Sequence, residues 1–146
     1  MTKRFACLTG VAPGVELAEK CAAIAAAGCA GVETLLFPND DLGKWQATMR
    51  QAAGNAGLDV AAVILGGLAL YQPGQEQWLA EAIQAVGELG AGVLMTPEYR
   101  PQDPLPIFPP YPAPSVAESE QVMRAMAVVD AAARRYSVSI FLEPLT

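Results

Sequence analysis

Residues 58–65 read LDVAAVIL, a short apolar run with β-branched residues that ends at the pair Gly66-Gly67. This composition and length indicate a buried β-strand. On its N-terminal side, Asn39, Asp40 and Asp41 offer N-cap oxygens to a helix that is expected to run to about Ala56. On its C-terminal side, Leu79, Ala82, Ile83 and Val86 lie on one face of a second helix. A buried strand between two amphipathic helices is typical of a parallel sheet.

The same alternation extends outward in both directions. Further helices are expected over Val15–Ala27, with Gly28 as its C-terminal cap, and from Ser115, where Glu118 completes a capping box. Residues 97–114 hold eight of the chain's twelve prolines, which predicts a long, stiff loop. The further strands are expected at Phe5–Thr9, Gly31–Phe37, Ala91–Thr96 and Val138–Leu142.

The predicted fold class is therefore α/β, with parallel (β/α) repeats in a single domain over residues 1–146. Two architectures satisfy this pattern: an open doubly wound sheet, or a barrel that stops after its fifth strand. A nucleotide-binding open sheet is expected to carry a glycine fingerprint after its first strand, and Gly10–Gly14 provides none. The spacing of the elements leaves both architectures open.

Composition excludes several function classes. The net charge is −6, and the few basic residues are scattered, which argues against binding to a nucleic-acid backbone. No apolar run is long enough to span a bilayer. We therefore expect a cytoplasmic location and no membrane partner. The absence of histidine excludes imidazole bases and imidazole metal ligands from this chain.

Three motifs carry a family resemblance. Residues 27–38 (AGCAGVETLLFP), Glu88–Ala91 (ELGA) and Ile140–Leu145 (IFLEPL) occur in the order and at the intervals expected of a (β/α) repeat. Together they resemble the end of helix 1 with strand 2, the end of helix 3, and strand 5 of the xylose-isomerase-like TIM barrels. The resemblance implies the N-terminal half of such a barrel, with about four βα units plus a fifth strand. At 146 residues the chain is shorter than the roughly 250 of a complete barrel.

The resemblance further implies a metal-dependent isomerase or epimerase. Glu143 matches the family's metal-ligating glutamate, which in some members also moves a proton. The expected substrates are small sugars, sugar phosphates or hydroxy-ketoacids, and the cofactor is a divalent cation (Mn²⁺, Mg²⁺ or Co²⁺) that stabilises an enediolate. The family's other ligands, an Asp, a His and a Glu, lie on later strands. The site is therefore expected to be incomplete in this chain, and the metal can be absent from it.

Three further residues are candidates for substrate contact. Tyr71 lies in the loop after the third predicted strand, and Arg100 in the proline-rich loop after the fourth, where it could contact a phosphate or carboxylate. Glu33 lies within the second strand, where it is expected to point into a barrel lumen or to pair with Lys3 or Arg4. Loops at the C-terminal ends of barrel strands carry the site in this architecture, so Tyr71, Arg100 and Glu143 are expected on one face.

The alternative function is a non-catalytic α/β half-barrel that acts through assembly or binding. Five strands of a barrel leave two unpaired edges and one uncovered apolar face. A homo-oligomer, or association with a C-terminal half, is therefore expected under either function. Metal bound at Glu143 would favour the isomerase, and a closed homodimer without metal would favour the assembly module.

Overall fold

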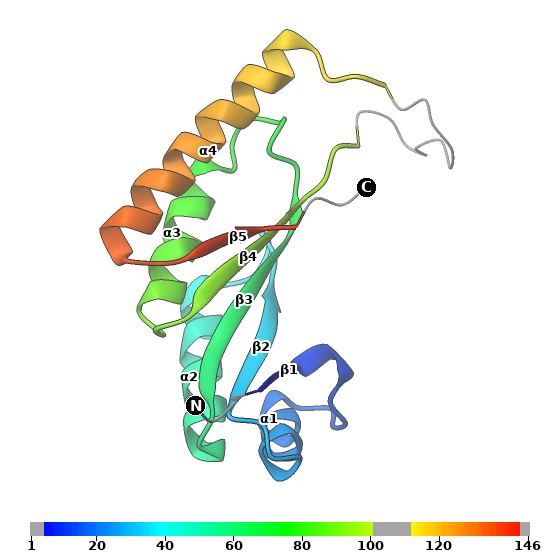
Figure 1. Ribbon diagram of the computed structural model, residues 1–146, viewed down its shortest axis with the longest axis vertical. Helices are drawn as coiled ribbons and strands as arrows, with labels where there is room; N and C mark the ends of the chain where they lie inside the picture. The colour runs from blue at the N-terminus through cyan, green and yellow to red at the C-terminus, as the bar shows by residue number, and fades with distance from the viewer. Residues whose placement is uncertain (1–4, 101–111, 144–146) are drawn as a thin grey trace.

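One parallel sheet runs through the centre of the chain (Figure 1), and the computed structural model describes residues 5–100 and 112–143. Strands and helices alternate along the sequence, with a short 3₁₀ turn, η1, after the first strand. This arrangement confirms the predicted α/β class with parallel (β/α) repeats. The elements are β1 (Ala6–Leu8), η1 (Thr9–Val11), α1 (Leu17–Ala26), β2 (Gly31–Leu36), α2 (Leu42–Ala56), β3 (Asp59–Leu68), α3 (Glu76–Gly87), β4 (Gly92–Pro97), α4 (Val116–Tyr136) and β5 (Ile140–Leu142).

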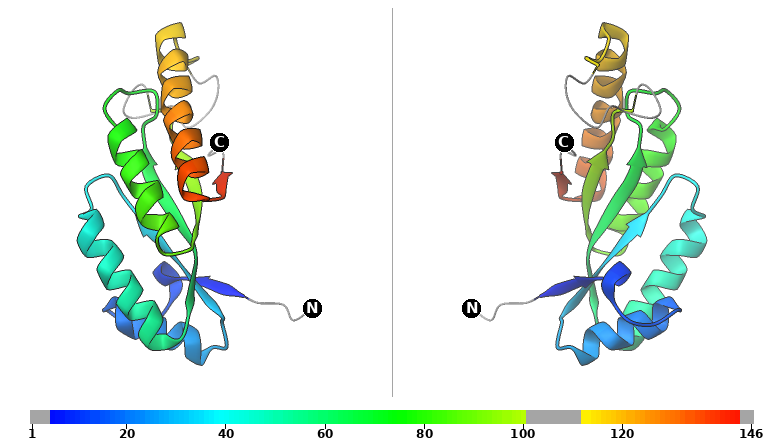
Figure 2. Two further views of the ribbon diagram at one scale, coloured as in Figure 1. Left: turned by 90° about the vertical axis from the view of Figure 1, so that its left-hand side faces the viewer. Right: turned by 90° about the vertical axis from the view of Figure 1, so that its right-hand side faces the viewer.

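The order of the strands decides between the two architectures that the sequence left open. The strands pair in chain order, β1-β2-β3-β4-β5, and every pair is parallel. A doubly wound sheet reverses its strand order at a switch point, and this sheet has no reversal. Successive β–α–β connections of the same hand that advance across the sheet in one direction place every helix on the same side of it. The helices therefore cover a single face (Figure 2). The sheet is therefore an arc of a barrel.

The hydrophobic core lies between the sheet and its helices. Val63 of β3 and Val93 of β4 are paired and fully buried, and Val32 of β2, which pairs with Val60, is fully buried as well. All three point toward the helices. Helices contact their neighbours in sequence, α1 with α2, α2 with α3, and α3 with α4. The helical side of the core includes Cys21, Ile24, Met49, Ala53, Leu79, Ile83, Val86, Ala125 and Val129.

The opposite face of the sheet carries apolar side chains, and no helix or strand of residues 5–100 and 112–143 covers it. Side chains alternate along a strand, so the neighbours of the buried valines point away from the helices. Leu35 is 36% exposed and Phe141 is 60% exposed on this face, and Ile64 and Leu94 are half-buried. We call it the helix-free face. Its apolar character accounts for part of the high apolar content, 53% of the sequence.

Strand β3 differs from its expected end. The pair Gly66-Gly67 was expected to stop the strand, but β3 continues to Leu68, which pairs with Pro97 after a shift of register. Gly67 has a φ of 66° in the left-handed region, which glycine adopts at little cost, so the pair forms a bulge. The strands β1 and β5 cover fewer residues than expected, and each pairs on one side only.

Helix termini largely follow the sequence expectations. The Asp41 carboxylate accepts a hydrogen bond from the Lys44 N–H and caps α2, and Ser115 with Glu118 forms the predicted capping box of α4. A second capping box, formed by Glu16 and Glu19 at α1, was not expected, because glutamate is an unusual N-cap residue. Among the described residues, no helix is both long and apolar enough to cross a membrane.

Truncation of a buried side chain should lower the free energy of unfolding more than truncation of an exposed one. Leu79 is fully buried against the core, whereas Met123 of α4 is 69% exposed. We expect Leu79→Ala to lower the free energy of unfolding by about 2–5 kcal/mol, because it removes apolar contacts and leaves a cavity. Met123→Ala should change it by less than about 0.5 kcal/mol. Urea unfolding followed by circular dichroism measures both, and equal losses would contradict this assignment of the core.

The helix-free face and the two edge strands favour self-association. β1 and β5 each present backbone donors and acceptors on one side, and an apolar face next to a free edge promotes pairing between chains. We expect an assembly larger than the 15.3 kDa chain in solution. Light scattering coupled to size exclusion measures the mass, and a monodisperse monomer at micromolar concentration would refute this expectation.

Candidate functional site

The loops that follow the strands meet at one edge of the sheet. Because all strands are parallel, their C-terminal ends point the same way, and the segments after β1, β2, β3, β4 and β5 lie along this edge. We call it the C-terminal edge. It contains Tyr71, Arg100 and Glu143, which are three of the four predicted site residues. Its described segments are residues 9–16, 37–41, 69–75, 98–100, 112–115 and 143.

Glu143 follows β5 at this edge. Its backbone N–H donates to the Met95 carbonyl at 3.0 Å, which continues the ladder in which Leu142 pairs with Met95. Met95 is fully buried on the helix side of the sheet, and its partner Leu142 lies on the same side. Glu143, the next residue along the chain, therefore points to the helix-free side. Glu143 is exposed there, beside Thr96 of β4. The fold thus places the carboxylate where the sequence predicted it, and its catalytic and metal-binding roles stay predictions.

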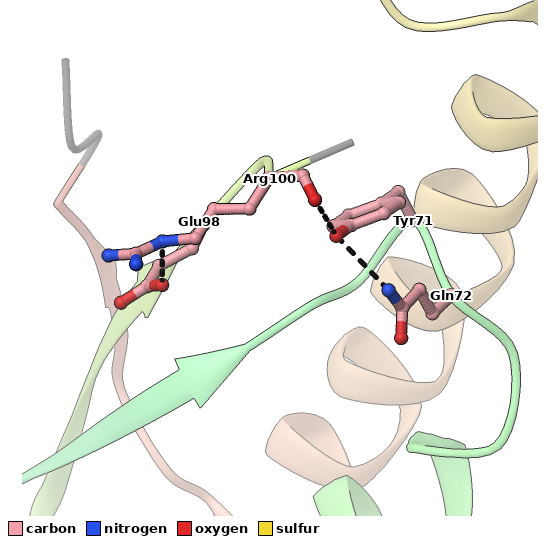
Figure 3. A network of polar contacts seen from close by, with 4 residues as sticks. All are labelled: Tyr71, Gln72, Glu98 and Arg100. Carbon is pink, nitrogen blue, oxygen red and sulfur yellow. Dashed lines mark hydrogen bonds and ion pairs between the residues drawn. The ribbon is translucent and has the colours of Figure 1, made fainter. Parts of the chain in front are cut away.

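The segment that follows β4 carries an ion pair. The Arg100 Nε lies 2.7 Å from the Glu98 Oε2, and Figure 3 shows the two side chains side by side. The Glu98 N–H donates to the Leu68 carbonyl at 2.9 Å, which extends the pairing of β4 with β3. Alternation along β4 places Glu98 on the same side as Thr96, and therefore as Glu143 on the neighbouring strand.

Tyr71 and Tyr99 hold this segment in place. The Tyr71 hydroxyl donates to the Arg100 carbonyl at 2.7 Å and accepts from the Gln72 amide at 3.1 Å (Figure 3). The two tyrosine rings meet edge to face, with centroids 5.0 Å apart. The Tyr99 hydroxyl donates to the Glu118 carboxylate of α4 at 3.3 Å. Burial, followed by the nearby Glu118 charge, raises the pKa of Tyr99, so its hydroxyl keeps its proton.

Phe37 adds an apolar surface to the edge. Its ring packs against Gly66, where a Cβ atom would lie 2.6 Å from the ring, and it is 43% exposed. A residue larger than glycine at position 66 would displace the ring. The bulge of β3 therefore also creates the space in which Phe37 sits.

Glu33 lies away from the edge. It pairs with Leu8 of β1 and Ala62 of β3, in the N-terminal half of β2, and alternation places it on the helix-free face with Leu35. The structure thus separates Glu33 from the loops that carry Tyr71, Arg100 and Glu143. Its predicted substrate contact stays a prediction. The alternative ion pair with Lys3 or Arg4 lies outside the described residues.

The described residues do not form a metal centre by themselves. Residues 5–100 and 112–143 contain no group of three or more His, Cys, Asp or Glu side chains that could hold an ion. Mg²⁺ and related cations prefer about six ligands, mostly oxygen. Glu143 with its described surroundings therefore supplies too few donors for the expected cation.

Comparison with solved structures identifies the architecture. An apo 3-keto-D-glucoside 4-epimerase from E. coli superposes with a TM-score of 0.72 at 18% identity, over 99% of this chain and 57% of that one. A D-psicose 3-epimerase solved in the presence of D-fructose superposes with a TM-score of 0.65 at 11% identity, over 94% of this chain and 51% of that one. Both are xylose-isomerase-like TIM barrels. The chain has their fold over about half of their length. No family model and no curated protein matches the sequence.

Two features of the edge were not predicted from the sequence. They are the ion pair of Glu98 with Arg100 and the contacts of Tyr99. In the sequence Glu98 is one of several charged residues of a proline-rich loop, and no motif marks Tyr99. The Glu98-Tyr-Arg100 spacing allows an ion pair between the first and third residues. The partners of Tyr99 come from the loop after β3 and from α4, which sequence distance does not reveal.

Acid should weaken the attachment of α4 to the edge. Two hydrogen bonds from Ser115, and a weaker one from Tyr99, lower the pKa of Glu118 in the folded chain. A lowered folded pKa stabilises the fold above the unfolded value of about 4.3 and loses this effect as the pH falls through the folded pKa. We expect unfolding free energy to fall below about pH 4, and to fall less in Glu118→Gln, which keeps an acceptor but does not titrate. Urea titrations from pH 6 to 3 measure this. An identical acid loss in both proteins would contradict it.

Proposed function

We propose that this chain contributes half of the active site of a sugar isomerase or epimerase. The observation that carries the proposal is the position of Glu143, an exposed carboxylate at the C-terminal end of β5 on the helix-free side of a half-barrel. Active sites of TIM barrels lie at that end of the strands. The two structural neighbours, which act on a 3-keto-glucoside and on D-psicose according to their names, support a sugar as the substrate class.

The proposed chemistry is the transfer of a proton at a carbon next to a carbonyl. Such a step needs a base within hydrogen-bonding reach of the carbon-bound proton and positive charge or hydrogen-bond donors near the enediolate oxygen. Glu143 is the residue that we propose as the base. Its backbone is fixed by the hydrogen bond to Met95, which orients the carboxylate relative to β4. Tyr71 and Arg100 are proposed to contact the substrate from the loops after β3 and β4.

The proposed cofactor is a divalent cation, Mn²⁺, Mg²⁺ or Co²⁺, with Glu143 as one ligand. Carboxylate oxygen suits each of these ions. The remaining donors must come from outside the described residues, which makes a C-terminal half-barrel the proposed partner.

A second function, an assembly or binding module without catalysis, is favoured by the helix-free face. Leu35 of β2 and Phe141 of the edge strand β5 are 36% and 60% exposed on this face, and a partner that covers them would bury apolar surface. In that case Glu143 would line an interface instead of a substrate site.

The test is a turnover assay with several ketoses and hydroxypyruvate, supplemented with Mn²⁺, Mg²⁺ or Co²⁺. We expect no measurable turnover by the 146-residue chain, and turnover when it is joined to a C-terminal half-barrel that supplies further ligands. In the joined protein, Glu143→Gln should abolish activity, because the amide neither accepts the proton nor binds a cation as well. Glu120→Gln, a matched change at an exposed position of α4, should retain it.

Turnover by the short chain that is lost in Glu143→Gln would show that two copies of the chain, or an unanticipated set of ligands within it, complete the site. Full activity of Glu143→Gln in the joined protein would refute the role of Glu143. A joined protein that folds but acts on none of the substrates would favour the assembly module.

A further inference from the structure

We infer that the C-terminal edge of this chain binds an uncharged, hydroxyl-rich part of the substrate and does not bind a phosphate or carboxylate group. The inference rests on the proposed function and narrows its substrate class to neutral sugars at this half of the site. Three observations carry it: the pairing of Arg100, the state of the helix N-termini, and the charge of the loops.

Arg100 is already paired with an anion. Its Nε lies 2.7 Å from the Glu98 carboxylate, so the pair carries no net charge toward a ligand. A phosphate would have to displace Glu98 or share the guanidinium with it, and the carboxylate would repel it. The guanidinium keeps its remaining N–H donors, which suit hydroxyl oxygens.

The pair is held in position from both ends of its segment. The Glu98 N–H bonds to Leu68, and the Arg100 carbonyl accepts from the Tyr71 hydroxyl. Between them, the Tyr99 ring packs on Tyr71 and its hydroxyl bonds to Glu118. This anchoring lowers the entropy that an exposed ion pair loses when it forms. Tyr71 and Tyr99 therefore act as positioning residues for the ion pair.

An acidic side chain of the chain itself lies at the N-terminus of each helix at this edge. Free N–H groups at a helix N-terminus are the usual phosphate site in parallel α/β folds. Here the Glu19 carboxylate accepts from the Val15 and Glu16 N–H groups before α1, and Asp41 accepts from Lys44 in α2. Ahead of α3 and α4, the Gly74 and Ser115 N–H groups donate to Glu76 and Glu118.

Hydrogen bonds at the helix ends lower the pKa of three of these carboxylates, Glu19, Glu76 and Glu118, and so favour their ionised form. Hydrogen bonds from the Val15 and Glu16 N–H groups lower the pKa of Glu19, and those from Ser115 lower the pKa of Glu118. The pKa of Glu76 is lowered chiefly by the Gln121 amide of α4, with a contribution from Gly74. An incoming anion at any of these ends would meet a carboxylate already in place.

The loops of the C-terminal edge are negatively charged, like the carboxylates at the helix ends. In the described segments of the C-terminal edge, the acidic residues are Glu16, Asp40, Asp41, Glu98 and Glu143, and Arg100 is the one basic residue. Like charges disfavour approach of an anionic ligand, and buried or partly desolvated ones do so more strongly. A neutral sugar avoids this repulsion, and its hydroxyl groups can donate to Glu98 and Glu143 while accepting from Arg100.

The experiment is a titration of the ¹⁵N-labelled 146-residue chain, followed by amide chemical shifts. The probes are D-fructose, D-fructose 6-phosphate, hydroxypyruvate and inorganic phosphate. We expect D-fructose to shift the amides of Glu98–Arg100 and Glu143, and inorganic phosphate at the same concentration to leave them unchanged. D-fructose 6-phosphate and hydroxypyruvate should bind the edge more weakly than D-fructose.

Two variants test the role of the ion pair. Glu98→Gln frees Arg100 and removes one negative charge, so it should gain phosphate binding by about tenfold, the effect of one charge-assisted hydrogen bond. The double variant E98Q/R100Q, in which no guanidinium is left to bind, should lose that gain. Far-UV circular dichroism verifies that both variants fold, as expected for exposed or half-buried positions.

Each outcome separates this inference from the proposed function. If phosphate or D-fructose 6-phosphate binds the unmodified edge as tightly as D-fructose, the inference is overturned and a sugar site remains. If Glu98→Gln gains no phosphate binding, pairing with Glu98 is not what excludes anions, and the inference is again overturned. If no sugar, phosphorylated or not, shifts the edge amides, the inference is overturned, whereas the proposed function is judged separately by the turnover of the joined protein and its Glu143→Gln variant.

Discussion

Parallel pairing of the strands in unbroken chain order is the constraint on which the rest of the structure depends. Each strand joins the next through a helix on the same side, so the valines at the centre of β2, β3 and β4 face one continuous core. The same order brings all C-terminal strand ends to one edge. A single reversal of strand order would move helices to the other face and divide the loops that now lie together.

The position of the loops explains the electrostatics of the edge. Every helix that starts there has an acidic side chain at its N-terminus. Asp41 accepts from the first turn of α2, and acids in the first turns of α1, α3 and α4 accept from N–H groups of the preceding loops. These acids stabilise the helix ends and also make the edge negative. The pairing of Arg100 with Glu98 removes the remaining local positive charge. One set of interactions therefore fixes the loops and restricts the kind of ligand that they can accept.

The helix-free face is the second consequence of the strand order. Leu35, Ile64, Leu94 and Phe141 point away from the helices and are packed on one side only. In a closed barrel this face is a filled core, and its side chains interdigitate in layers. In the chain described here the surface favours association, because covering it removes apolar area from water. Under the proposed function, one additional layer would both complete the site and cover this face.

The sequence by itself determined the order of the elements, their parallel pairing and the local caps. Asp41 and the Ser115–Glu118 box were identified because a cap joins residues that are three positions apart. The barrel arc and the bulge at Gly66-Gly67 were decided by tertiary structure, since both depend on which strands become neighbours. So was the contact between Tyr71 and Arg100, whose partners lie 29 residues apart. Periodicity records which face of an element is apolar, but only the folded chain specifies what that face meets.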